Sequence, residues 1–214
     1  MKPFYTLFIT LLIAHLSYAQ NSSNSDTVEK KNNHKIIISV EEVPEFPGGI
    51  HAFINYLSKN LRYPEVARLI GINGKLNVSF VVDTDGRVTD VTPNNCIGAG
   101  CEAEASRLLE MSPTWKPGIQ NSKPVRVRYT VPISFSLGQE KVRAYMQNLR
   151  KSDYGFVFNI KNTLYTIDEA EKILGNSFMS DQIEIAEPFY NYNKVQKFEM
   201  PNKKEVYLLI LKST

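Results

Sequence analysis

A run of residues near the middle of the chain alternates strictly between two classes of side chain. The apolar members are Val125, Val127, Tyr129, Val131, Ile133 and Phe135, and the positions between them hold Arg126, Arg128, Thr130, Pro132 and Ser134. A period of two is typical of a β-strand with one buried face, because successive side chains point to opposite sides. Proline has no N–H to donate to a neighbouring strand, so Pro132 predicts that this strand lies at a sheet edge.

The residues before this strand predict a hairpin and the helices that would cover it. Residues 75–82 alternate in the same way, and Asp85-Gly86 is a tight-turn dipeptide leading to a second strand over 87–92. Apolar residues recur at helical spacing over 50–57 and 101–109. Pro64 suits the first position of a helix, and Gly71 suits the position just past its end. We therefore predict an α+β fold in which two or three helices pack on a small antiparallel three-stranded sheet.

The amino terminus has the features of an export signal. Lys2 precedes a mostly apolar stretch over 4–14, and Ser17-Tyr18-Ala19 offers a cleavage site before Gln20, so residues 1–19 are expected to be a signal peptide. The apolar stretch is shorter than the roughly 18–20 residues that span a bilayer. Residues 20–35 are polar and predict a disordered leader, with a strand over 36–40. We expect a periplasmic protein, with an inner-membrane anchor formed by an uncleaved amino terminus as the alternative.

The last third of the chain predicts a second, smaller α+β module over 153–214, after a connecting helix within 138–152. Strands are expected over 156–160, 163–165, 183–185 and 206–211. Thr166 and Glu169 have the spacing of a capping box, and Gly175 would end the helix that follows. The main domain is then expected to cover 36–137.

Charge and motif content exclude several classes of protein. Basic residues (25) and acidic residues (22) are mixed, which leaves a formal net charge of +3 and no footprint of a nucleic-acid binder. The sequence has no nucleophile elbow, zinc-protease helix or phosphate-binding loop. Glu102 and Glu104 lie two apart on different helix faces, so we expect solvated charges rather than an acid–base pair. We predict that the chain is not an enzyme and takes no cofactor, metal or small-molecule substrate.

The two cysteines, Cys96 and Cys101, are close in sequence. In an oxidising compartment such a pair is a candidate disulfide. Free thiols are the alternative, because the geometry of the loop can forbid the bond. Zinc would need further ligands, and the histidines are far away in sequence.

Three stretches resemble one known family when they are taken together and in order. They read YPEVARLIGINGKLNVSFVVDTDGRVTDV, EASRLLEMSPTWKPG and KPVRVRYTVPISF. They are similar to the carboxy-terminal domain of the TonB energy-transducer family, over about residues 43–137 if the lead-in VPEFPGG is included. The motif positions are Tyr63, Pro64, Gly71, Gly74, Asp85, Gly86, Trp115 and Pro117. We expect Gly71 and Gly74 to ease the passage from helix to strand, and Trp115 to pack the second helix onto the sheet.

The resemblance implies helices on one side of a small sheet, and a module that grips an extended segment of an outer-membrane TonB-dependent receptor or another envelope protein. Residues 153–214 are more weakly similar to the plug domain of such receptors. The chain lacks the long proline-rich spacer of a full transducer, which places coupling to the inner-membrane motor in doubt. The alternative function is a structural or regulatory envelope protein that binds cell-wall glycan or its own copy, including as a homodimer.

An edge strand over 125–135 would leave one side of its backbone open to a partner strand. Because Pro132 must turn its nitrogen outward, residues of the same parity should turn their N–H and C=O outward as well. We therefore predict partner binding along Arg126, Val127, Arg128, Tyr129 and Thr130, with Arg126 and Arg128 favouring acidic or polar partners.

The export signal generates the first testable prediction. Protein purified from the cell envelope should begin at Gln20 or close to it, because small residues follow the short apolar core. Intact-mass spectrometry measures this directly. A mass that retains residues 1–19 would instead support the anchored form.

Overall fold

The computed structural model describes residues 40–139, 141–190 and 196–212. The predicted signal peptide, the leader and all but the last residue of the strand expected over 36–40 lie outside the described residues. Within them, no helix has the length and apolar content needed to cross a membrane.

The first part of the chain contains three helices and five strands. The helices are α1 (Gly49–Asn60), α2 (Glu65–Ile70) and α3 (Cys101–Glu110), and the strands are β1 (Gly74–Val82), β2 (Val88–Pro93), β3 (Gly118–Gln120), β4 (Lys123–Val125) and β5 (Val127–Phe135). Strands β3 and β4 pair as a separate small hairpin. The strand predicted over 125–135 is therefore interrupted at Arg126, between β4 and β5.

The main sheet has the strand order β2-β1-β5 and is antiparallel throughout. The register between β1 and β5 runs without a shift from Gly74 opposite Phe135 to Val82 opposite Val127. By contrast, a bulge interrupts the β1–β2 register between Ser79 and Val81. Among the residues that the structure describes, strand β5 pairs with β1 alone, which confirms the edge position that Pro132 predicted and the α+β class with a three-stranded sheet.

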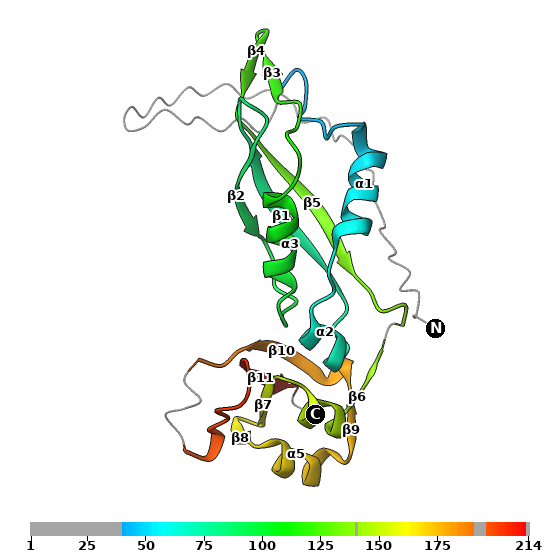
Figure 1. The fold of residues 1–214 in the computed structure, drawn as a ribbon, viewed down its shortest axis with the longest axis vertical. Helices are drawn as coiled ribbons and strands as arrows, with labels where there is room; N and C mark the ends of the chain where they lie inside the picture. Colours follow the sequence, from blue (N-terminus) through cyan, green and yellow to red (C-terminus); the bar gives the residue numbers. More distant parts are fainter. Residues whose placement is uncertain (1–39, 140, 191–195, 213–214) are drawn as a thin grey trace, which may run out of the picture.

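Helices cover one face of this sheet. Helix α3 packs over β2 and β1, and α1 lies toward the β5 side in Figure 1. The buried residues Leu76, Val78 and Phe80 of β1 point into the layer between sheet and helices, together with Val131 and Ile133 of β5. Alternation along β5 thus has the cause expected from the sequence, one buried face, whereas the central strand β1 is buried on both faces from Val78 to Val82.

Trp115 joins a helix to the sheet, although not the helix that was expected. Its ring lies 5.2 Å from that of Phe53 in α1, 5.4 Å from that of Phe80 in β1 and 5.5 Å from that of Phe46. The expectation that Trp115 packs the second helix is corrected, because Phe46 brings the segment before α1 down onto the same aromatic cluster. Its indole N–H donates to the Ser112 hydroxyl at 3.1 Å.

The second part of the chain forms a further α+β region. Its elements are β6 (Arg143–Tyr145), α4 (Met146–Lys151), β7 (Gly155–Ile160), β8 (Thr163–Tyr165), α5 (Ile167–Leu174), β9 (Ser177–Met179), the short 3-10 helices η1 (Ser180–Gln182) and η3 (Gln196–Phe198), β10 (Ile183–Pro188) and β11 (Val206–Leu211). The helix expected within 138–152 is shorter than predicted, because Arg143–Tyr145 pairs with β9.

A four-stranded sheet of order β10-β11-β7-β8 organises this second region, with β7 and β11 parallel. The Thr166–Glu169 capping box is present at the start of α5, and Gly175 follows its last residue. Both features are local in sequence, which is why the pattern alone predicted them.

Backbone contacts attach the second region to the first, below α2 and α3 in Figure 1. The Ala99 N–H donates to the Ala186 carbonyl at 2.8 Å, so the loop before α3 meets strand β10. Gly98 has φ +82, and a Cβ there would lie 2.5 Å from the Ala186 oxygen. Gly71, the left-handed cap of α2, similarly meets Val142. Both glycines therefore permit backbone approach as well as a positive φ.

The close approach of Gly98 to Ala186 can be tested by comparing the stability of two glycine-to-alanine variants. Gly98→Ala should lose about 1–2 kcal/mol of unfolding free energy from its left-handed backbone, and roughly 1–3 kcal/mol more from overlap with Ala186. Gly138→Ala is the control, because Gly138 has φ +77 with no atom within 4 Å of the added Cβ. Urea denaturation measures both variants. Equal losses would mean that the approach to β10 imposes no constraint.

Candidate functional site

The outer side of β5 presents backbone groups that no strand of the sheet uses. Asn77 of β1 stands opposite Pro132 and directs both of its backbone groups away from β5. Its N–H donates to the Asn95 side-chain oxygen at 2.7 Å, and its carbonyl accepts from the Asn94 N–H at 2.8 Å. The Asn77–Pro132 pair is therefore a non-hydrogen-bonded pair, and the backbone of Pro132 faces outward. By the same alternation, Thr130 and Arg128 turn their N–H and C=O outward.

The side chains of this edge divide between the two faces of the sheet. Val127 is buried, and Tyr129 is half-buried with its ring 6.1 Å from that of Trp115. Arg128 and Thr130 are exposed on the opposite face, where the Thr130 hydroxyl lies 2.8 Å from the Ser79 hydroxyl. Within the described ranges, no hydrogen bond or ion pair holds the Arg128 side chain. The structure thus brings together an open backbone and one available cation.

Arg126 does not lie in the exposed position on the edge strand that the sequence predicted. It lies just outside β5, and its side chain is only 13% exposed. The guanidinium forms ion pairs with Asp90 at 3.1 Å and with Asp83 at 3.6 Å. The expectation of an exposed Arg126 is corrected, because the β1–β2 hairpin carries both carboxylates to the start of β5. Arg128 remains the exposed cation of β5, near the start of the strand.

The turn and joint residues of the sequence motif hold the helices, turns and strands of the domain together and do not form part of the open edge. Tyr63 donates its hydroxyl to the Ile72 carbonyl and sets its ring against that of Phe135. Pro64 is the cap residue before α2, one position earlier than predicted. Gly86 lies in the β1–β2 turn with φ +82, where its carbonyl accepts from the Trp115 N–H at 2.8 Å. The other motif residues lie at the ends of strands or in the turn: Gly74 begins β1, Asp85 lies in the β1–β2 turn, and Pro117 precedes β3.

The two helix glutamates are held by partners, which corrects the expectation of solvated charges. Glu102 accepts from the backbone N–H groups of Ile97 at 2.6 Å and Gly98 at 2.8 Å. Burial would raise the pKa of Glu102, but these backbone hydrogen bonds outweigh it and hold the pKa below its usual value. Glu102 therefore fixes the loop that contacts β10.

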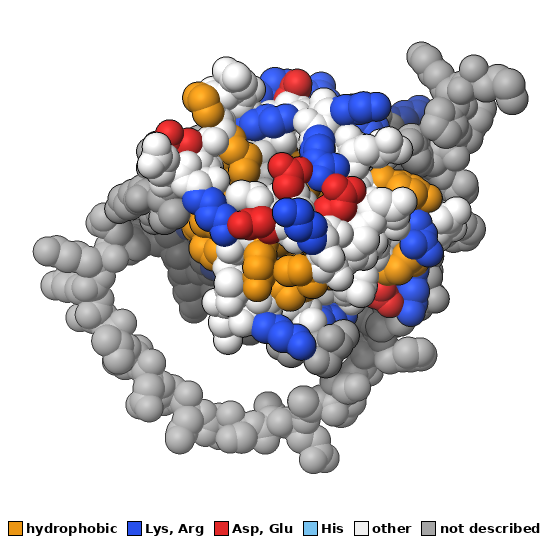
Figure 2. All heavy atoms as spheres, turned by 90° about the horizontal axis from the view of Figure 1, so that it is seen from below, with side chains coloured by type: hydrophobic (Ala, Val, Ile, Leu, Met, Phe, Trp, Pro, Cys, Tyr) orange, Lys and Arg blue, Asp and Glu red, His pale blue; other side chains and the backbone are white. Residues whose placement is uncertain are grey.

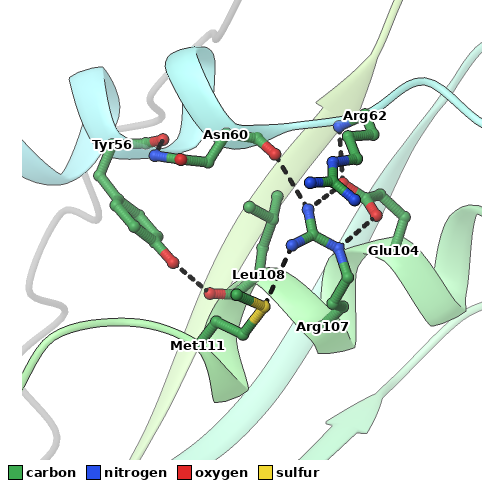
Figure 3. A network of polar contacts seen from close by, with 7 residues as sticks. All are labelled: Tyr56, Asn60, Arg62, Glu104, Arg107, Leu108 and Met111. Carbon is green, nitrogen blue, oxygen red and sulfur yellow. Dashed lines mark hydrogen bonds and ion pairs between the residues drawn. The ribbon is translucent and has the colours of Figure 1, made fainter.

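Glu104 is the centre of the network drawn in Figure 3. Its side chain is 10% exposed and forms a two-point contact with Arg107, at 2.6 and 2.7 Å. The same carboxylate accepts from the Arg62 N–H at 2.6 Å, and Arg107 donates to the Asn60 carbonyl at 3.0 Å. The end of α1 is thereby fixed to α3. Of these contacts, only the pairing of Glu104 with Arg107 could be predicted from the sequence, because the two residues are three positions apart on one helix.

The disulfide expected between Cys96 and Cys101 is not formed, and both residues are free thiols. Cys101 is buried and Cys96 is exposed. Burial is the largest of the effects that raise the pKa of the two thiols. A hydrogen bond to Glu102 raises the pKa of Cys96 further. The nucleophilic thiolate is therefore disfavoured at both positions. Among the described residues, no group of three histidine, cysteine or acidic side chains could hold a metal ion.

The Glu104 network predicts a measurable contribution to stability. Glu104→Ala should reduce the free energy of unfolding by about 1–3 kcal/mol, because the Arg62 N–H and the Arg107 guanidinium lose their acceptor. Glu110→Ala on the same helix is the control, since Glu110 is exposed and should change stability by no more than about 0.5 kcal/mol. Thermal and urea unfolding compare the two variants. A loss at Glu104 no larger than at Glu110 would contradict the role of the network.

One family model and two solved structures are similar to part of this chain. A family model described as "Gram-negative bacterial TonB protein C-terminal" matches residues 59–137. Two solution structures of the Helicobacter pylori TonB carboxy-terminal domain, a longer and a shorter form, are both 24% identical to this chain. They cover 44% and 42% of it, and 89% and 95% of their own lengths, with TM-scores of 0.31 and 0.29.

No curated protein matches the chain. The family match begins inside α1 and ends just after β5, so it contains the whole three-stranded sheet and leaves the second α+β region outside. The resemblance inferred from the sequence is thus confirmed: residues 59–137 match the TonB C-terminal domain, and this match covers less than half of the chain.

Proposed function

We propose that this protein is a non-enzymatic interaction module of the cell envelope, connected with TonB-dependent transport across the outer membrane. Its partner is an extended segment of an outer-membrane receptor or of another envelope protein, which adds as a strand to the outer edge of β5. The observation that carries the proposal is the open backbone of Arg128, Thr130 and Pro132. Strand addition to a free sheet edge is a general mode of peptide recognition.

Two further observations support this binding mode. The β1–β5 ladder keeps one side of β5 occupied along its whole length, so the edge is held straight before a partner arrives. The exposed Arg128 lies at the amino-terminal end of the open stretch, where a partner carboxylate would gain a weak, salt-sensitive attraction. The export signal of residues 1–19 and the TonB family match support a periplasmic location.

A proline substitution tests the mode of binding. Arg128→Pro should abolish peptide binding, because it removes an outward N–H and leaves the ladder to β1 intact. Arg128→Ala should only weaken binding. Nine-residue peptides selected on the immobilised parent protein are labelled, and their binding is measured by fluorescence anisotropy. If Arg128→Pro binds as well as the parent, the partner does not add as a strand here.

The neighbouring residue supplies the control for folding. Tyr129 stands opposite Phe80 with its N–H in the ladder, so Tyr129→Pro should cost about 3 kcal/mol or more and change the circular dichroism spectrum. Arg128→Pro should retain the spectrum of the parent.

Self-association or glycan binding is the alternative function, and the same preparation distinguishes it. Sedimentation velocity reports dimers that Arg128→Pro dissolves, which would identify a second copy as the strand that is added. Retention of cell-wall fragments on the immobilised parent, with no peptide selected, would favour the glycan-binding function.

A further inference from the structure

The face of β5 that the helices cover has one accessible side chain. Five side chains of β5 point to that face, and four of them are no more than 6% exposed: Val127, Val131, Ile133 and Phe135. Tyr129, between Val127 and Val131, is half-buried. It is therefore the position on this face of β5 at which a partner can still bury apolar surface.

Printed ring contacts place the Tyr129 side chain in an aromatic group on the β1 side. Phe80 stands opposite Tyr129 on β1, and their rings are 5.9 Å apart. The Trp115 ring lies 6.1 Å from that of Tyr129 and 5.4 Å from that of Phe80. Since β5 pairs with β1 alone in the described part of the chain, an added strand would place its side chains on the other side of Tyr129.

The pattern of the ladder brings one partner side chain especially close to Tyr129. The Asn77–Pro132 pair is non-hydrogen-bonded, so by alternation Phe80 and Tyr129 form a hydrogen-bonded pair. In an antiparallel added strand, which continues the pattern of this sheet, the residue opposite Tyr129 would form a non-hydrogen-bonded pair with it. The Cα atoms of such a pair are only about 4.5 Å apart. Side chains are closest at these positions, and aromatic pairs there stabilise a sheet.

We propose that Tyr129 selects an extended partner segment that carries an aromatic residue opposite it. The partner ring would continue the group of Phe80, Trp115 and Tyr129 past the edge of the sheet, in the tilted or edge-to-face geometry that aromatic side chains prefer. The inference rests on the proposed strand addition and names the chemistry of the segment that is added. Selection acts at this one position, because the neighbouring side chains on the same face are already buried.

The first experiment compares designed peptides on the mature protein. Nine-residue peptides of alternating threonine and valine carry phenylalanine, leucine or alanine at the central position, and their binding is measured by fluorescence anisotropy. Phenylalanine should bind about tenfold more tightly than alanine, because its ring is buried against Tyr129. It should bind about threefold more tightly than leucine, which is apolar but has no ring. Equal affinity of the phenylalanine and leucine peptides would overturn the choice of an aromatic residue.

A substitution of Tyr129 tests where the aromatic residue docks. Tyr129→Val removes the ring and keeps a β-branched strand residue, so the preference for phenylalanine over alanine should disappear. Tyr145→Val on β6 is the matched control, because Tyr145 is 41% exposed on a strand of the second region. Figure 2 shows the end of the molecule that this region forms, and on its described part the apolar side chains lie in small groups between charged ones. A Tyr129→Val variant with the circular dichroism of the parent and an undiminished preference would place the aromatic residue elsewhere.

A second measurement needs no substitution in the protein, since Trp115 is its single tryptophan. In one peptide 4-nitrophenylalanine, which quenches tryptophan fluorescence, replaces the central residue, and in another it replaces a terminal residue. The two positions are about 13 Å apart in an extended strand. At saturation, the central quencher should reduce Trp115 emission more strongly than the terminal one. Equal quenching by the two peptides would contradict the position opposite Tyr129.

Arg128→Pro separates the failure of this inference from the failure of the proposed function. If Arg128→Pro abolishes binding of every peptide while the parent binds the phenylalanine, leucine and alanine peptides alike, strand addition stands and the aromatic selection is wrong. If Arg128→Pro binds all peptides as the parent does, the strand addition itself fails, and this inference fails with it.

Discussion

The antiparallel ladder between β1 and β5 is the interaction on which the other features of the first region depend. Each strand has nine residues, and the register between them is uninterrupted. Because side chains alternate along both strands, one register sends Leu76, Phe80 and Ile133 toward the helices together. A shift of one residue would expose this set. The same register decides which backbone groups of β5 remain unpaired, so the core and the candidate site have one cause.

Features that depend on neighbouring residues could be predicted from the sequence. The alternation along 125–135, the Asp85-Gly86 turn and the Thr166–Glu169 capping box are each determined by positions within a few residues of one another. The edge position followed from one chemical fact, the missing N–H of Pro132. The family resemblance extended these local inferences to the order of strands in the sheet.

Features that depend on distant partners could not be predicted in this way. The pairing of Arg126 with Asp83 and Asp90 needs the geometry of the β1–β2 hairpin, which no spacing in the sequence specifies. Glu104 was expected to be a solvated helix charge, because one of its hydrogen-bond donors, the Arg62 N–H, lies 42 residues earlier in the sequence. Pattern analysis determined which faces are buried, but not which polar groups meet.

Pro132 also sets how long a bound strand would stay in place. Of the outward-facing residues of β5, Arg128, Thr130 and Ser134 can donate an N–H, whereas Pro132 can only accept through its carbonyl. The ladder that a partner can form is therefore interrupted at Pro132, and each of its hydrogen bonds adds only about 0.5–1.5 kcal/mol net of water. A contact of this size dissociates quickly, since differences in affinity appear mainly in the dissociation rate. The proline thus favours a partner that is exchanged repeatedly over one that is retained.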